Sequence, residues 1–330
     1  MASTKRKTLL IFKYLSEYSD ESHVLSSTQL IDMLRKDGIK CERKSVYDDI
    51  KMLNEIGFDI LTSRTPPKGF FMASRNFELA EVRLLIDAVS SAGFITPDKT
   101  RELVKKLESL VSKNQAKELV SQVYVDSAVK CDNEEIYYTI DALHEAIVSK
   151  NKVKFTYKRR NIDKEHMKSY TEKKFTVSPY ALIWKEDHYY LVCNNEKYDN
   201  LMNLRLDRIR KIVKLEEPSR DICEVCEYDD VFDVADYTSK MFNMFSGESM
   251  QVTLVCDMQL REEIMDRFGA KIPLKAIDSE HFETTFEAAV SDGLVSWIMN
   301  FGDKIKVKSP QTLAQSIKTK AEEILDLYLN

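Results

Sequence analysis

Hydrophobic residues recur with helical spacing in three segments near the start of the chain. The first helix is predicted over residues 5–18, with Leu9, Leu10, Phe12, Leu15 and Tyr18 on its apolar side. The second follows N-cap candidates at 26–28 and ends near Asp37, because Gly38 suits the position after a helix C-terminus. The third begins near Glu42, and Gly57 ends it.

The third helix is predicted to bury one face and to expose another. Its apolar residues are Val46, Ile50, Leu53 and Ile56, which are spaced by 4, 3 and 3 positions. Two short strand-like runs, FDILTSR and FFMASR, then flank the turn TPPKG. Helix, helix, short turn, helix and hairpin follow one another in this order in a winged helix-turn-helix, which we therefore predict for residues 1–75.

The polar side of the third helix carries the candidate DNA-binding residues. Basic and hydroxyl side chains at a helix start can contact base edges, and the hairpin tip can reach an adjacent groove. The candidates are Arg43, Lys44, Ser45, Tyr47, Lys51 and Lys68. A winged helix that binds protein is the alternative, and the net charge of +3 over residues 1–75 does not decide between them.

A helical region is predicted for residues 76–150. Within 77–125 the pattern breaks at Thr96 and Pro97, where Thr96 is a good N-cap and Pro97 suits the first helical position. A further helix at 134–149 is expected to bury Ile136, Ile140, Leu143 and Ile147. We interpret the region as a linker and dimer surface, and an ordinary intramolecular core is the alternative.

The hydrophobic period changes from helical to alternating near residue 151. Val153, Phe155 and Tyr157 alternate with lysines, as in a half-exposed strand. More strands are predicted at 173–180, 181–184, 188–193 and 201–206, which together make a small curved sheet or barrel over 151–215. Residues 216–250 are acidic and are interpreted as an irregular linker, and residues 251–330 alternate strands and helices in the order of a ferredoxin-like fold.

Charge is strongly segregated along the chain, although its net value is only -5. Residues 150–214 carry a net charge of +9, and residues 215–330 carry -12. Such a basic segment within an acidic protein indicates an anionic partner.

Residues 178–209, SPYALIWKEDHYYLVCNNEKYDNLMNLRLDRI, resemble the core of the WYL domain. The most specific part is the run Arg205 to Ile209, and the tripeptide that names the family stands here as Tyr189-Tyr190-Leu191, with Tyr in place of Trp. The ending KIKVKSPQTLAQSIKTKAEEILDLY resembles the C-terminal extension of many WYL proteins, and residues 1–75 resemble the winged helix that usually precedes the domain.

The resemblance implies a bacterial, homodimeric transcription regulator with an α+β multidomain fold. A cytoplasmic location is expected because Lys13, Ser16 and Glu17 interrupt the apolar positions near the N-terminus, unlike in a signal peptide. A winged helix would bind double-stranded operator DNA, and an Sm-like WYL barrel would sense single-stranded DNA or a nucleotide. Exposed cations beside aromatic rings suit such a ligand, because phosphates take the charge and bases stack on rings. The candidate effector-binding residues are Tyr180, His188, Tyr190, Arg205, Arg208, Lys154 and Lys158.

Strand parity separates these candidates from the predicted core. Tyr189 and Leu191 share one face and are assigned to the core, whereas His188 and Tyr190 share the other face and are assigned to the ligand. Asp207 is expected to hold a neighbouring arginine or a turn. A buried core position with a satisfied hydroxyl is the alternative for Tyr180 and Tyr190.

Other chemistry is disfavoured by the sequence. Cys223 and Cys226 have ligand spacing, but no second such pair follows, so reduced thiols are expected rather than a metal site. No dinucleotide-binding, P-loop or Gly-x-Ser-x-Gly motif occurs, so neither a cofactor nor catalysis is expected. No membrane partner is expected, because no run of 18 apolar residues is present. The alternatives to a regulator are a protein-interaction scaffold and a single-strand binder without promoter control.

Overall fold

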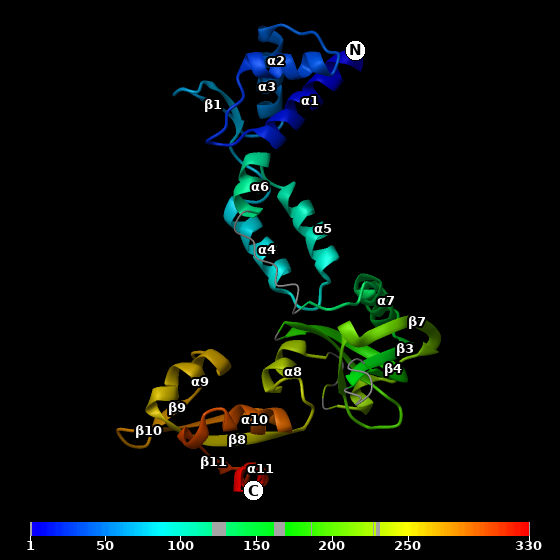
Figure 1. Ribbon diagram of the computed structural model, residues 1–330, viewed down its shortest axis with the longest axis vertical. Coiled ribbons are helices and arrows are strands. Elements are labelled where there is room, and N and C mark those ends of the chain that lie inside the picture. Colours follow the sequence, from blue (N-terminus) through cyan, green and yellow to red (C-terminus); the bar gives the residue numbers. More distant parts are fainter. Residues whose placement is uncertain are drawn as a thin grey trace. The chain divides into compact units, whose positions relative to one another are not determined.

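The computed structural model describes residues 2–120, 130–161, 169–185, 187–226, 228 and 232–329 (Figure 1). The chain divides into two compact units, Met1–Glu134 and Glu135–Asn330. The predicted mixture of α and β structure, with helices first and several sheets after them, is confirmed. None of the helices within the described ranges is both long and apolar enough to cross a bilayer.

The first unit begins with three helices and a two-stranded sheet. These are α1 (Ala2–Tyr18), α2 (Ser27–Lys36), α3 (Arg43–Glu55), β1 (Ile60–Ser63) and β2 (Gly69–Met72). Ser26 caps α2 through a reciprocal contact with Gln29, and the core includes Leu15, Leu30 and Val46. Ile56, predicted to be buried, is 65% exposed because α3 ends at Glu55 and the chain turns away.

Three further helices follow among the described residues of the first unit. They are α4 (Leu79–Ser91), α5 (Pro97–Glu108) and α6 (Lys113–Val120), and the hydroxyl of Thr96 caps α5 as predicted. Their shared core includes Val82, Ile86 and Val104, which fits the intramolecular alternative for part of the apolar stripe. The predicted helical region reached residue 125, and its last part, 121–125, lies outside the described residues.

The second unit begins with α7 (Ile136–Val148), which packs on a five-stranded antiparallel sheet. The sheet order is β6-β5-β4-β3-β7, with β3 (Asn151–Asn161), β4 (Ser169–Lys185), β5 (His188–Asn194), β6 (Met202–Arg205) and β7 (Ile209–Pro218). The strands predicted at 173–180 and 181–184 form one strand, because a bulge between Pro179 and Ala181 lets β4 bend without ending. Strand β7 was not predicted.

The acidic segment after the sheet is more regular than predicted. It contains α8 (Val234–Lys240), which Asp233 caps through the backbone N–H groups of Ala235 and Asp236. At the other end, Lys185 Nζ donates to the carbonyl of Met241 at 2.8 Å and Arg267 donates to it at 2.9 Å. Tertiary contacts at both ends therefore stabilise a helix that its short sequence pattern did not reveal.

The last part of the chain is a four-stranded antiparallel sheet with helices. Its elements follow the order β8 (Glu248–Asp257), α9 (Arg261–Phe268), β9 (Leu274–Ala276), β10 (His281–Val290), α10 (Asp292–Met299), β11 (Ile305–Ser309) and α11 (Gln311–Leu329). The strands lie in the order β11-β8-β10-β9. Phe282, Leu294 and Leu313 lie in the core between the sheet and the helices.

Candidate functional site

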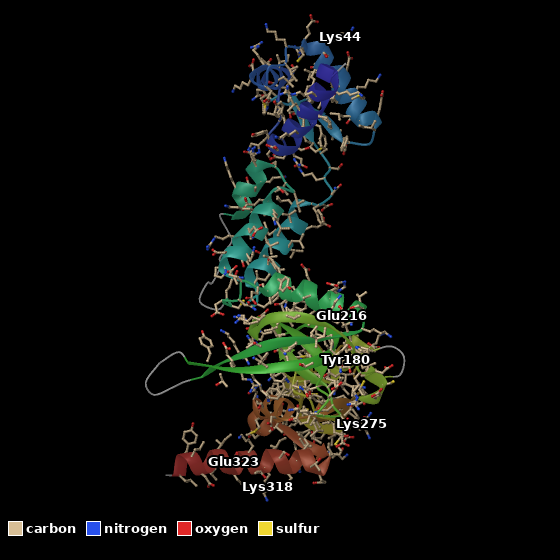
Figure 2. The ribbon with its side chains drawn as sticks, turned by 90° about the vertical axis from the view of Figure 1, so that its right-hand side faces the viewer. Lys44, Tyr180, Glu216, Lys275, Lys318 and Glu323 are labelled. Atoms are coloured by element: carbon tan, nitrogen blue, oxygen red, sulfur yellow. The ribbon has the colours of Figure 1, made fainter. Side chains whose placement is uncertain are left out.

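One face of α3 presents most of the predicted DNA-binding side chains to solvent. Arg43, Lys44 and Lys51 are exposed, and Tyr47 is 43% exposed (Figure 2 labels Lys44). Arg43 donates to the Tyr47 hydroxyl at 3.1 Å, one helical turn further on. We call Arg43, Lys44, Tyr47 and Lys51 the α3 face.

Ser45 is the candidate that the structure separates from the α3 face. Its hydroxyl accepts a hydrogen bond from Lys7 of α1. Lys7 also pairs with the buried Asp49 at 2.9 Å, and Thr8 donates to Asp49 at 2.8 Å. Ser45 therefore belongs to a polar network that joins α1 to α3, and sequence spacing did not show this because the partner is 38 residues away.

The hairpin is fixed against α3. The rings of Tyr47 and Phe70 meet edge to face, 5.1 Å apart, and Phe70 pairs with Leu25 as an isolated bridge. A side chain at Gly69 would lie 2.7 Å from the backbone of Leu25, so only glycine allows this approach. Lys68, at the hairpin tip, is exposed.

The end of α1 is joined to α6 by buried and exposed polar contacts that the sequence did not reveal. Asp20 is only 2% exposed and accepts a hydrogen bond from Ser112 at 2.5 Å. Lys113 pairs with Glu17 at 2.9 Å, and Arg75 donates to the carbonyl of Ser19 at 2.7 Å. These contacts connect the first helices, which carry the DNA-binding candidates, to the helical region within the first unit.

In the second unit, Arg205, Asp207 and His188 form a compact group that we call the Arg205 cluster. Arg205 donates to both carboxylate oxygens of Asp207, at 3.0 and 2.7 Å. Its Nη1 atom lies 2.8 Å from Nε2 of His188. The predicted structural role of Asp207 is thus observed, and the arginine is already paired.

His188 is held neutral by this arrangement. Because a guanidinium can only donate, Nε2 must accept and the ring proton must lie on Nδ1. Burial and then the Arg205 charge lower the pKa of His188. Its Nδ1 is buried and has no hydrogen-bond partner within the described part of the chain.

The parity assignment along β5 differs from the structure. Tyr190, assigned to the ligand face, is only 8% exposed and packs with Ile183, Val192 and Tyr237. Tyr189, assigned to the core, is only half-buried. The reason is that the segment after the five-stranded sheet covers the Tyr190 face, so both faces of β5 are buried beyond Tyr189.

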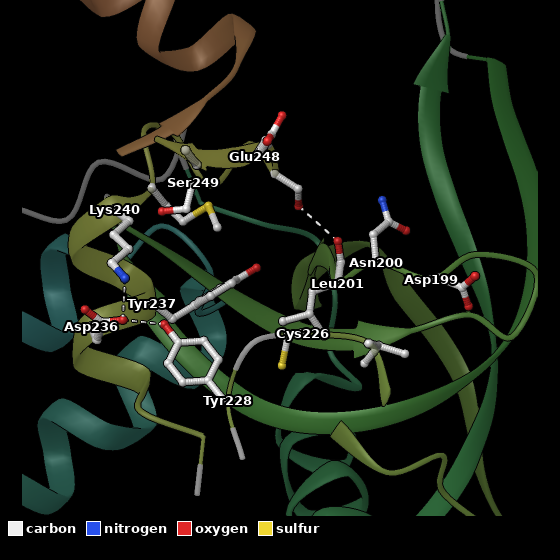
Figure 3. A pocket seen from close by; sticks show the side chains of 15 residues that line it. Asp199, Asn200, Leu201, Cys226, Tyr228, Asp236, Tyr237, Lys240, Glu248 and Ser249 are labelled. Atoms are coloured by element: carbon white, nitrogen blue, oxygen red, sulfur yellow. Dashed lines mark hydrogen bonds and ion pairs between the residues drawn. The ribbon is translucent and has the colours of Figure 1, made fainter. Parts of the chain in front are cut away.

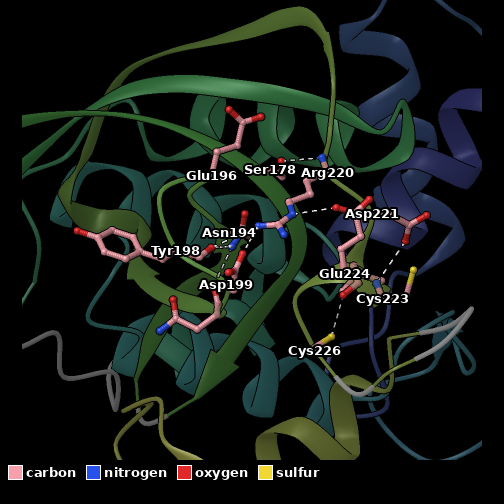
Figure 4. A network of polar contacts seen from close by, with 12 residues as sticks. Ser178, Asn194, Glu196, Tyr198, Asp199, Arg220, Asp221, Cys223, Glu224 and Cys226 are labelled. Atoms are coloured by element: carbon pink, nitrogen blue, oxygen red, sulfur yellow. Dashed lines mark hydrogen bonds and ion pairs between the residues drawn. The ribbon is translucent and has the colours of Figure 1, made fainter.

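Tyr180 contacts a different polar network. This network centres on Arg220, which Figure 4 shows together with Asp199 and Glu224. The Tyr180 hydroxyl donates to the carbonyl of Arg220 at 3.0 Å, and burial raises the pKa of Tyr180 to about 12. Arg220 itself pairs with Asp199 at 2.9 Å and with Glu224 at 3.0 Å. Arg220 was not a predicted site residue, because two of its partners, Tyr180 and Asp199, come from distant parts of the sequence.

Lys154 and Lys158 lie on a third surface, the exposed side of β3. Opposed residues of antiparallel strands point to the same side, so Lys154, Thr156 and Lys158 share this side with Lys174 and Arg210. Lys158 pairs with Glu172 at 2.9 Å and lies 5.8 Å from the ring centre of Tyr170, which is 47% exposed. We call Lys154, Lys158, Lys174 and Tyr170 the β3 face.

The predicted effector residues are therefore not gathered in one place. Arg205 and His188 are in contact, and the ring centres of His188 and Tyr190 are 6.2 Å apart. Arg208 lies in the turn after Arg205 and is half-exposed. Tyr180 and the two lysines lie elsewhere. The sequence analysis did not select Tyr170 and Trp184, whose rings are exposed. The alternation of polar and apolar residues around them could have indicated this exposure.

The two cysteines with ligand spacing differ in their exposure. Cys223 is exposed, Cys226 is half-buried, and the six cysteines form no disulfide bonds in the structure. Among the described residues, no group of three or more His, Cys, Asp or Glu side chains could hold a metal ion.

Comparison with known proteins identifies the two domains of the second unit. The model of the WYL domain matches residues 138–213, and the model of the WCX domain matches residues 248–325. The chain therefore carries a WYL domain followed by a WCX domain, and the resemblance stated for residues 178–209 and for the C-terminal ending is confirmed.

No curated protein matches the chain. A solved structure that matches is the proteasome accessory factor B/C (PafBC) of Arthrobacter aurescens, at 14% sequence identity and a TM-score of 0.29. The match covers 98% of this chain and 48% of that chain, so this chain spans about half the length of that relative.

Proposed function

We propose that the protein is a homodimeric, sequence-specific DNA-binding transcription regulator whose WYL domain senses a nucleic acid or nucleotide and alters operator binding. The observation that carries this proposal is the α3 face beside the Lys68 hairpin, in a chain that also carries a WYL and a WCX domain. Residues 1–75 would act as a winged helix-turn-helix, the barrel as an Sm-like sensor and residues 251–330 as a ferredoxin-like extension.

The order and contacts of the first elements support duplex binding. A helix such as α3 can enter the major groove, where Arg43 and Lys44 at its start would contact bases or phosphates. Tyr47 braces the helix against Phe70, so the hairpin and its Lys68 keep a fixed position beside α3. Lys68 would then contact the phosphate backbone of an adjacent groove.

The β3 face supports binding of a single-stranded effector. Lys154 and Lys174 are exposed, and the exposed Tyr170 ring can stack a base. In the Arg205 cluster, by contrast, the charge of Arg205 is neutralised by its ion pair with Asp207. We therefore assign the first phosphate contacts of the effector to Lys154 and Lys174, because Lys158 is already paired with Glu172. Arg205 and His188 would have a shaping role.

Dimerisation is supported by apolar residues that the first unit leaves exposed. Leu84 of α4 is 70% exposed and Leu85 is 38% exposed, although other residues of α4 form the core of the helical region. A second copy would cover such residues. Two recognition helices would then reach successive half-sites of a pseudo-palindromic operator.

The proposal is tested by fluorescence anisotropy with the duplex upstream of the protein's own gene and a scrambled duplex as competitor. Selective binding that a short single-stranded oligonucleotide shifts is the expected result. Equal and salt-sensitive binding to both duplexes would reduce the activity to non-specific electrostatics. No duplex binding by folded protein would favour a protein-interaction scaffold or a single-strand binder without promoter control.

A further inference from the structure

A cavity of about 690 Å³ lies within the second unit, where three parts of the chain meet (Figure 3). The loop after β5 supplies Asp199 and Leu201, the segment around α8 supplies Tyr228 and Lys240, and β8 supplies Glu248. This volume is in the range of small-molecule sites, about 300–1,000 Å³. None of the predicted effector residues lines it.

The cavity has an apolar floor and polar walls. Leu201, Val225, Met241 and Ala289 are all buried and belong to one apolar cluster. The rim near β8 is fixed, because a side chain at Gly247 would lie 2.1 Å from the carbonyl oxygen of Val290. The floor therefore offers a preformed surface for a hydrocarbon or aromatic group.

The hydroxyl and ammonium groups of the lining already donate to protein acceptors. Tyr228 donates to Asp236 at 2.6 Å, and Tyr237 donates to Asn203 at 3.1 Å. The hydroxyls of Ser246 and Ser249 donate to the carbonyl of Leu201 and to Glu287, respectively. An anion entering the cavity would thus find these donors occupied.

The lining ammonium group is also neutralised. Lys240 Nζ lies 2.8 Å from Asp236 and 3.2 Å from a second carboxylate, that of Glu287. Asn200 adds an amide, which can both donate and accept. The cavity therefore lacks an unpaired positive charge among the described lining residues.

What the lining retains is acceptor capacity and negative charge. The lining carries three carboxylates, Asp199, Asp236 and Glu248, and one ammonium group. Asp199 is already paired with Arg220, so the carboxylates open to a ligand are those of Asp236 and Glu248. The contacts from Tyr228 and Lys240 both use Oδ2 of Asp236, and they lower the pKa of Asp236, so this carboxylate is ionised at neutral pH. Glu248 is exposed and has no ion-pair partner among the described residues.

We propose that this cavity binds a small organic amine that is protonated at neutral pH, with its ammonium group on the lining carboxylates and its apolar body on the floor. The site is separate from the β3 face, which suits anions. A bound amine would contact the barrel loop, the α8 segment and the WCX sheet together, and would stabilise their arrangement within the second unit.

The test is isothermal titration of the full chain, without DNA, against phenethylamine, tryptamine and spermidine. The neutral 2-phenylethanol and the anionic phenylacetate are the matched analogues of the first probe. We expect at least one amine to bind once per chain, at least tenfold more tightly than either analogue. Absence of amine binding at millimolar concentration, or equal binding of the analogues, would overturn the proposal.

Variants locate the site. Glu248→Gln and Asp236→Asn should each weaken amine binding at least fivefold, and Glu248→Gln should fold normally because Glu248 is exposed. Glu263→Gln, which changes an exposed residue of α9 outside the cavity, should leave binding unchanged. Unchanged binding in both cavity variants would overturn the assignment. Because no DNA is present, this result does not depend on whether the chain binds an operator.

Discussion

The α3 face and the Arg205 cluster both place arginine where the sequence predicts ligand contact, but their charges are used differently. Arg43 contacts the neutral Tyr47 of its own helix, whereas Arg205 makes two bonds to Asp207 and one to His188. A ligand gains little from a guanidinium that is already paired, because it must first displace the carboxylate. The comparison teaches that pairing, rather than residue type, separates a surface for a partner from a part of the framework.

The largest effect is expected on the buried side of α3. Asp49→Ala would leave Lys7 buried without its carboxylate partner, and such losses cost about 3–5 kcal/mol. Asp48→Ala, which changes the exposed neighbour, should cost less than about 0.5 kcal/mol. Urea unfolding followed by circular dichroism measures both. Similar stability of the two variants would show that the network joining α1 and α3 contributes nothing.

Substitutions in the Arg205 cluster should lower the stability of the fold. Asp207→Ala removes the two carboxylate contacts of a half-buried guanidinium and leaves the one to His188, so we expect a loss of about 1–3 kcal/mol in unfolding free energy. Asp199→Ala breaks another aspartate–arginine pair of the same unit, but Asp199 is 83% exposed, so its loss should stay within about 1 kcal/mol. If the Asp207 variant were as stable as wild type, the Arg205 cluster would have a ligand-binding role rather than a structural one.

The hairpin tip should act through charge alone. Lys68→Ala should weaken binding to the upstream and scrambled duplexes alike, and should reduce the slope of log affinity against log salt by about 1. Anisotropy titrations at several salt concentrations measure this slope. A selective loss for the upstream duplex would mean that Lys68 reads sequence.

The smallest effect is expected at His188. Its pKa is lowered by burial and by Arg205, so the unfolded chain binds a proton more readily than the folded protein. Stability is therefore complete above the ordinary pKa, about 6.5, and declines as the pH falls below it. The drop in urea midpoint between pH 7.5 and 5.5 should be smaller for His188→Gln than for wild type. An equal or larger drop in the variant would contradict this assignment.

Local signals in the sequence predicted much of the fold. Ser26 and Thr96 cap their helices, and Val153, Phe155 and Tyr157 alternate into the core as expected. These features depend on neighbours within a few positions, which spacing and propensity describe.

What could not be predicted depends on distant contacts. The acidic segment forms α8 because Lys185 and Arg267 satisfy the end of the helix, and the two lie 82 residues apart in the sequence. Parity along β5 separated its two faces correctly but could not show that Tyr237 and Met241 would cover the face of Tyr190. The exposure of the candidate residues was predicted well along α3, where the helix has one exposed side. It was predicted poorly along β5, where both faces of the strand are covered.

The most direct test of the central claim is the ratio of affinities for the upstream and scrambled duplexes, measured at one salt concentration for wild type and for Arg43→Ala and Lys44→Ala. Lys51→Ala, further along the same exposed face, is the matched control. The account predicts that at least one of the first two variants lowers this ratio, which corresponds to a loss of about 1–3 kcal/mol in discrimination between the duplexes. The control variant should weaken binding to both duplexes equally. A ratio unchanged in both variants would contradict recognition of operator DNA by the α3 face.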